Sequence, residues 1–476
     1  MKKALPLLLL IFLLLSCARN ADEGALPLRI ALAQEPPSLD VMLTSSISAR
    51  MIAQGNVYEK LVRLEEGKAV PELAESWELS PDGRRLTFRL RPGVTFHDGA
   101  PMASSDVSSS LNRWLESYSP AQELCGDARF TAGEGTVSIE SSRSLALLPL
   151  MLASSPQAAV IMPERLLGPL VSEYVGTGPY RFISWKSGEG AELERYEGYW
   201  GDAPAIDRLS YLFVPDSVTR RLGLETGLYD AIDTVSNDDI PQLSENEGIR
   251  LLQGEESGEI ALVLNRTRGP MRSPELRRVL SVMLDRENLM RSCYGSSGYS
   301  LHSDYMEKSA WSVPDSLDPY GEGSSEPVPE LLAEAGETKV KILTSNLSGL
   351  DRIALALSSE LGRLGIDSEI TLLDWVSFLE KRKDLDAWDI YISAYTRTAL
   401  PSQKAYLKGY EELLRPVSEA ETEEEALEAW REVQLLLWED VPVIIPGHYS
   451  TTYAVKQQIK GVEVRDGFYF MKAWAE

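Results

Sequence analysis

The chain has 476 residues and a formal charge of −25, from 47 Lys and Arg against 72 Asp and Glu. A surface this acidic repels polyanions, which excludes nucleic acid and anionic lipid as partners bound through the overall field. The length allows two or three domains with their own cores. The three histidines and three cysteines show no paired spacing of metal ligands, so we expect no metal site and no cofactor.

The N-terminus has the features of a secretory signal. Two lysines precede an apolar run, Ala4–Leu15, which is shorter than the roughly 20 residues of a spanning helix. The run leads into Leu-Leu-Ser-Cys, ending at Cys17, which resembles the lipobox of bacterial lipoproteins. We therefore expect a signal peptide over residues 1–16, a lipid-modified Cys17 and a tether over residues 17–27. The alternative is an ordinary signal peptide whose cysteine is incidental.

No second apolar run of this length follows, so we expect the rest of the chain to be exported. It would lie in the periplasm or at the cell surface, held to a bacterial membrane by the lipid. In such a compartment the two remaining cysteines, Cys125 and Cys293, allow one disulfide but no disulfide scaffold.

The stretch LTFRLRPGVTFHDG, residues 86–99, places His97 directly before an aspartate. Alternating apolar residues predict a half-buried strand over residues 86–90 and a second short strand up to Phe96, followed by an Asp-Gly turn. No nucleophile or second metal ligand lies nearby in the sequence. We therefore expect His97 to form structural hydrogen bonds rather than to act in catalysis.

A helix is predicted directly after this turn. Val107, Leu111 and Trp114 recur on one face, and Ser104 or Ser105 could cap its start.

The second half of the chain alternates strands with helices. Strands are predicted over residues 339–345, 366–373 and 388–396, with one helix ending at Gly365 and another over residues 375–382. This β-α-β-α-β order predicts a parallel sheet with right-handed crossovers.

Two longer amphipathic helices are predicted over residues 275–290 and 421–438, outside this alternation.

Several blocks, in this order along the chain, resemble a family of solute-binding proteins for peptides and nickel that serve ABC importers. The blocks are Pro71–Val107, Gly176–Trp185, Tyr196–Trp200, Asp216–Asp230, Leu276–Met290 and Glu439–Pro446. The resemblance implies an α/β, two-lobed periplasmic-binding-protein-like fold of class II type, with an extra inserted subdomain. It also implies that the histidine of residues 86–99 is structural.

The same resemblance implies the domain boundaries. Lobe I would comprise residues 28–56, 172–258 and 446–476, the inserted subdomain residues 57–171, and lobe II residues 259–445. Three passages of the chain between the lobes would form a hinge.

Polar and aromatic residues follow the three strands predicted for lobe II, where open α/β sheets bind ligands. They are Asn346, Asp374, Trp375, Tyr395 and Arg397. Simpler roles are also open: Asp374 as a helix cap, Trp375 packed on the sheet, and Arg397 in solvent or paired with a surface acid.

The resemblance sharpens two of these positions and adds one. Family members often carry an aromatic residue after the last strand, which Tyr395 matches, and then an acid that peptide binders use for the ligand's amine. That acid is missing here and Arg397 lies near its place, so we expect a ligand with an anionic or strongly accepting group. Met51 falls where nickel-binding relatives place a methionine facing the ligand, although a core position is the alternative.

The sequence therefore predicts a non-enzymatic, lipid-anchored and monomeric receptor. It would bind a small polar solute, a peptide or peptide-like molecule, between two lobes and deliver it to an ABC permease. The alternatives are a nickel-chelate or oligosaccharide binder of the same family, an extracellular hydrolase, or a sensing or adhesive protein that has lost transport.

Overall fold

The computed structural model describes residues 27–306, 311–313, 339–347, 349–398, 400–464, 468–470 and 472–475, without the side chains of residues 255–257. Cys17, the signal peptide and nearly all of the predicted tether lie outside these ranges. Within them, no helix is long and apolar enough to cross a membrane.

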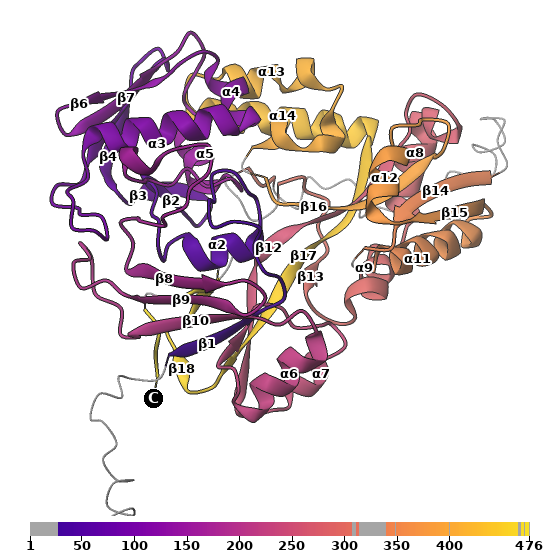
Figure 1. The fold of residues 1–476 in the computed structure, drawn as a ribbon. Coiled ribbons are helices and arrows are strands. Elements are labelled where there is room, and N and C mark those ends of the chain that lie inside the picture. The colour runs from indigo at the N-terminus through magenta and orange to yellow at the C-terminus, as the bar shows by residue number, and fades with distance from the viewer. Residues whose placement is uncertain are drawn as a thin grey trace, which may run out of the picture.

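An eleven-stranded mixed sheet runs through the molecule (Figure 1). Ten strands form its path, and β13 (Tyr299–Ser300) pairs with β17 off this path. In order across the sheet they are β15 (Asp367–Leu373), β14 (Lys339–Ser345), β16 (Ile390–Thr396), β12 (Ile249–Leu264), β17 (Val443–Lys456), β11 (Ala231–Ile232), β1 (Leu28–Leu32), β10 (Arg208–Phe213), β9 (Gly190–Arg195) and β8 (Tyr180–Lys186).

The two long central strands belong to both halves of this sheet. β12 pairs with β17 from Ile249 to Val263, whereas it pairs with β16 only from Gly258 onward. Register shifts interrupt the β12–β17 ladder between Gln253 and Gly258. The irregular stretch of β12 therefore lies where one half of the sheet gives way to the other.

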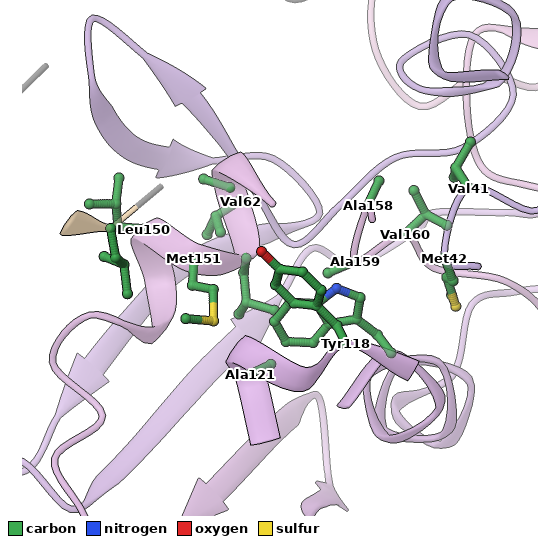
Figure 2. Close-up of a cluster of buried hydrophobic side chains, with 14 of the residues drawn as sticks. Val41, Met42, Val62, Tyr118, Ala121, Leu150, Met151, Ala158, Ala159 and Val160 are labelled. Carbon is green, nitrogen blue, oxygen red and sulfur yellow. The ribbon is translucent and has the colours of Figure 1, made fainter. Parts of the chain in front are cut away.

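A separate small sheet unit lies beside the first half. Its strands are β4 (Ala74–Leu79), β5 (Arg85–Leu90), β7 (Thr136–Glu140) and β6 (Phe130–Gly133), accompanied by α3 (Ser104–Ser117), α4 (Ser119–Cys125) and α5 (Leu148–Ser154). The alternation predicted for residues 86–90 is confirmed, because Leu86, Phe88 and Leu90 are buried. Figure 2 shows the core of this unit, with the Tyr118 ring near Ala121 and Met151.

The second half of the large sheet is covered on both faces. One face of β12 and β16 packs in a core with α8 (Pro274–Met283), α9 (Arg286–Tyr294) and α11 (Leu350–Arg363). The opposite face packs against α14 (Glu423–Asp440) and residues 400–414, in a core continuous with that of the small sheet unit.

The remaining elements are short. They are the helices α2 (Ile47–Ala53), α6 (Ser217–Thr226), α7 (Ile240–Ser244), α12 (Trp375–Lys381) and α13 (Glu411–Glu419), the 3-10 turns Glu164–Leu166, Pro270–Arg272, Pro401–Gln403 and Ala405–Leu407, and the strand pairs β2 (Val62–Glu65) with β3 (Lys68–Pro71), β18 (Ile459–Lys460) with β21 (Trp474–Ala475), and β19 (Glu463–Val464) with β20 (Phe468–Tyr469).

The predicted β-α-β-α-β segment is confirmed. β14 pairs in parallel with both β15 and β16, and Gly365 has the positive φ of 79° expected just beyond the end of α11.

Two details of the predicted helices are wrong. Residues 275–290 form two helices, because Leu284 is extended and the Asp285 carboxylate accepts from the Asn288 amide, which begins α9. The helix after the Asp-Gly turn begins at Ser104 with Ala103 as its N-cap, and the Asp106 side chain accepts from the Ala103 amide.

The two cysteines of the described part, Cys125 and Cys293, are both buried. No disulfide joins them, so the possible disulfide between them is absent. Burial raises the pKa of the Cys125 thiol to about 12 and that of Cys293 to about 11.

Candidate ligand-binding site

The parallel pairing brings the ends of three strands to one edge of the large sheet. β14 lies between β15 and β16, and Ser345 is level with Leu373 at the end of β15. Asn346 and Asp374 follow these ends and are exposed. The three loops predicted to converge therefore do lie along the same edge.

Asp374 has a structural role that uses one of its oxygens. It is the N-cap of α12, and its Oδ1 accepts from the Ser377 amide at 3.1 Å. Hydrogen bonds from Ser377 lower the pKa of Asp374, so the carboxylate stays charged at neutral pH. Asp374 therefore has the capping role that the sequence left open as the simpler alternative.

Trp375 and Tyr395 belong to one chain of aromatic side chains. Trp375 stacks on Phe378 with ring centres 5.5 Å apart, and Phe378 meets Tyr391 edge-on at 6.0 Å. The Tyr391 and Tyr395 hydroxyl oxygens are 2.8 Å apart. Burial raises the pKa of Tyr395 above its ordinary value, so its hydroxyl stays neutral and can donate.

Arg397 and Met51 lie in different surroundings. Arg397 is half-buried, one residue beyond the end of β16, at the edge where the aromatic chain ends. Met51 lies on α2 with 3% exposure and is part of the core. Its carbonyl accepts from Asn56 and Tyr211. The structure thus gathers five of the predicted residues at one edge and leaves Met51 in the interior.

Next to Tyr395 lies a buried ion pair that the sequence analysis did not find. The Lys404 ammonium donates to both oxygens of Glu259, each at 2.8 Å, and the Tyr406 hydroxyl donates to the same carboxylate at 3.0 Å. The side chains of Glu259 and Lys404 are 1% and 2% exposed. The residues are 145 positions apart, so no local motif could have joined them. The available signal was an acid inside the apolar pattern of a strand.

Three neighbouring strands place their side chains in a row at this level. Tyr395 on β16 is in register with Glu259 on β12, which is in register with His448 on β17. Directly paired residues of antiparallel strands point to the same face. His448 is buried, and its Nε2 lies 2.8 Å from the carbonyl of Asp304.

The segment that supplies Lys404 also touches the small sheet unit. Gln403 donates from Nε2 to the Tyr118 hydroxyl at 3.0 Å. The Ser144 hydroxyl donates to the carbonyl of Ala420, the residue after α13. Figure 1 shows α13 and α14 next to α4. The ion pair therefore lies where the large sheet, α14 and the small sheet unit meet.

A second buried carboxylate lies where the resemblance blocks converge. Glu59 is 4% exposed and accepts from the Thr177 and Tyr199 hydroxyls at 2.8 Å and from the Trp200 indole at 2.9 Å. Burial, followed by the nearby charge of Glu72, raises the pKa of Glu59 to about 8.

His97 belongs to this same junction and is structural, as predicted. Its Nδ1 accepts from the Gly176 amide at 3.3 Å and its Nε2 donates to the Gly178 carbonyl at 3.0 Å. The ring meets Tyr196 edge-on, with centres 5.1 Å apart. Burial lowers the pKa of His97 to about 4, so the ring is neutral at physiological pH. No group of three or more metal-ligating side chains occurs in the described ranges.

Comparison with known proteins gives the family. Residues 68–411 match the model of the protein family described as "Bacterial extracellular solute-binding proteins, family 5 Middle". The chain belongs to this family. Its members are solute-binding components of ABC importers, and they are not enzymes.

Individual relatives have low sequence identity to this chain but align over most of its length. A dipeptide-binding protein of Escherichia coli (strain K12) is 23% identical over 469 residues, covering 86% of each chain. A probable peptide ABC transporter periplasmic-binding protein of Sinorhizobium fredii is 26% identical over 444 residues, covering 80% of this chain and 82% of that protein.

Solved structures share the fold. The ABC transporter substrate binding protein CtaP from Listeria monocytogenes matches with a TM-score of 0.83 at 20% identity, covering 94% of this chain and 99% of that one. NikA from Brucella suis, solved in complex with Fe(III)-EDTA, matches with a TM-score of 0.81 at 19% identity, covering 95% and 100%. The predicted two-lobed α/β binding-protein fold is thereby confirmed.

Proposed function

We propose that this solute-binding protein is a monomeric lipoprotein that captures a small peptide-like solute carrying an anionic or strongly accepting group. The ligand lies at the sheet edge formed by Asn346, Asp374, Trp375, Tyr395 and Arg397, and the loaded protein docks on its ABC permease. The two lobes take the boundaries given above and move about β12 and β17. The ligand favours the closed arrangement because it makes contacts that exist only there.

The observation that carries the ligand class is the position of Arg397. It is half-buried two residues after Tyr395, which belongs to the aromatic chain that includes Trp375. A guanidinium presents a rigid fork of donors that matches a carboxylate or phosphate. An aromatic wall next to this fork suits the flat amide groups of a short peptide or related compound.

A screen identifies the ligand by measuring the melting temperature of the protein with peptides, N-acylated peptides, sugars, metal chelates and carboxylates. The ligand is the compound that raises the melting temperature. Calorimetry then compares wild type with Arg397→Ala. Removing one partner of a desolvated charge pair costs about 2–5 kcal/mol, so we expect affinity to fall by at least about 30-fold. Arg84→Ala, an exposed arginine of the small sheet unit, is the matched control and leaves affinity unchanged. A loss below about threefold places Arg397 outside the site.

The lipid anchor has its own experiment. The Leu-Leu-Ser-Cys sequence before the tether supports acylation at Cys17, and two or more acyl chains hold a protein stably on a membrane. We expect Cys17→Ala to move the protein from the membrane fraction to the soluble fraction. Mass spectrometry of the mature N-terminus that finds an unmodified residue contradicts the anchor.

A further inference from the structure

The buried ion pair beside Tyr395 has the composition of an ammonium-binding site. Glu259 supplies a carboxylate, and Tyr406 adds a hydroxyl that donates to it at 3.0 Å. The ring of Tyr406 lies 6.0 Å from the Lys404 ammonium and meets the ring of Tyr395 edge-on at 5.1 Å. A carboxylate with aromatic faces around it is what binds a primary ammonium. Lys404 places its own ammonium there.

The position of this pair relates it to the solute site. Glu259 and Tyr395 are in register on neighbouring strands and point to the same face. Lys404 lies between the two 3-10 turns Pro401–Gln403 and Ala405–Leu407, the first of which begins five residues after the end of β16. Its neighbour Gln403 reaches Tyr118 of the small sheet unit. The ammonium therefore lies next to the proposed ligand edge and at the meeting point of two parts of the fold.

Stability alone does not account for this pair. Both side chains are at most 2% exposed, so both charges have lost their water. Such a pair often contributes nothing over well-packed apolar residues of the same volume, because desolvation offsets the attraction. The pair therefore has a second description: Glu259 forms a binding site for a cation, and the ammonium of Lys404 occupies this site.

We propose that Glu259, Tyr406 and Tyr395 form an ammonium site that Lys404 occupies, and that Lys404 thereby excludes solutes with a free primary amine. This rests on the proposed solute edge at Tyr395. Lys404 is then a specificity-determining residue: the carboxylate that would hold a ligand's amine is already neutralised, and an incoming ammonium finds no acceptor. Together with Arg397, it selects a ligand without a free amine.

The test removes the internal cation and offers an external one. Lys404→Met shortens the side chain by the one atom that carries the charge and leaves Glu259 without a counter-charge. Ethylammonium is the probe, and tetramethylammonium, which has a charge but no N–H, is its control. We expect ethylammonium to raise the melting temperature of Lys404→Met by about 2–4 °C while leaving wild type unchanged. Alanyl-alanine should bind to the variant and not to wild type, and N-acetyl-alanyl-alanine should not gain.

A second variant keeps the test decisive when Lys404→Met folds poorly. Glu259→Gln/Lys404→Met removes both charges, and we expect it to fold and to show no response to ethylammonium. If the single variant unfolds, refolding from urea is compared with and without ethylammonium, and recovery only with ethylammonium supports the site. No rescue of the single variant, or equal responses of both variants, overturns the proposal. The outcome is independent of Arg397, so failure of the proposed ligand class is seen separately.

Discussion

Glu59 and Glu259 are both buried carboxylates at junctions between parts of the fold, but their partners differ. Three neutral donors, from Thr177, Tyr199 and Trp200, surround Glu59. A full ammonium, from Lys404, and one phenol surround Glu259. Neutral donors leave a buried charge only partly compensated, whereas an ammonium cancels it and creates a second charge with the same need.

These partners determine how each junction responds to movement and to charge. Around Glu59 no group depends on a counter-charge, so we expect this junction to stay fixed. Around Glu259 each charge depends on the other, so any movement that parts Lys404 from β12 exposes two charges together. A junction of the second kind suits a place where the charge of a ligand affects the balance between the two buried charges.

The largest expected effect comes from replacing each of the two glutamates with glutamine in turn. Glu259→Gln leaves the Lys404 ammonium buried without its partner, and removing one member of such a pair costs about 3–5 kcal/mol. Glu59 is largely protonated at pH 7 because of its raised pKa, so Glu59→Gln exchanges one neutral group for another, and we expect a change of about 1 kcal/mol or less. Urea denaturation measures both. Equal losses would show that the two junctions do not differ.

The second test uses pH at Glu59. Its pKa is about 8 in the folded protein and near 4.5 when unfolded, so between these values the folded state holds a proton that the unfolded state lacks. The stabilisation is complete below pH 4.5 and is lost as pH rises through 8. We expect wild type to lose about 1–3 kcal/mol more than Glu59→Gln between pH 5 and pH 9. Parallel curves for the two proteins would contradict the raised pKa.

His97, at the same junction, gives a pH dependence of the opposite sign. Its pKa is about 4 when folded, against 6.5 when unfolded. Its stabilisation is therefore complete above pH 6.5 and is lost as pH falls towards 4. We expect wild type to lose about 1–2 kcal/mol over this range relative to His97→Gln, which removes the titration.

Ligand affinity of His97→Gln should stay within about threefold of wild type, since both ring nitrogens bond only backbone atoms. A complete loss of binding with an unchanged melting temperature would contradict the structural role.

The two junctions also show how far sequence reasoning reaches. Most of the first junction comes from the blocks that carry the family resemblance, and His97 was given a structural role from the sequence. Thr177 and Trp200 lie in those blocks, but no role was assigned to them from the sequence. The strands β14, β15 and β16 were also predictable, because apolar periodicity depends on local residues. Their shared edge followed from the parallel pairing, and it brought Tyr395 and Trp375 onto one aromatic chain.

The second junction was out of reach for a physical reason. Glu259 and Lys404 meet only when a strand and a distant 3-10 segment pack together, and neither residue lies in a motif.

The break in the helix over residues 275–290 was missed because both parts share one apolar stripe, and the Asp285 cap is a local detail that periodicity does not report. Met51 was predicted as a ligand residue and lies in the core, because the sequence pattern of a helical methionine is the same in both positions.

The smallest effect concerns the contact that ties the second junction to the small sheet unit. Tyr118→Phe removes the hydroxyl that accepts from Gln403, while the ring stays packed beside Met151 and Ala121 (Figure 2). A single neutral hydrogen bond is worth about 0.5–1.5 kcal/mol, so the open-to-closed ratio should rise by about 2- to 12-fold. Spin labels on Arg84→Cys and Arg415→Cys, both exposed, report the distance across this contact in a protein that carries Cys17→Ala, because Cys125 and Cys293 are buried. Ser154→Ala removes a hydroxyl bond within α5 of the same unit and is the matched control. A larger long-distance population in Tyr118→Phe, with Ser154→Ala unchanged, supports an opening movement that parts Gln403 from the small sheet unit. Identical distributions in all three proteins would show that this contact does not hold the closed arrangement.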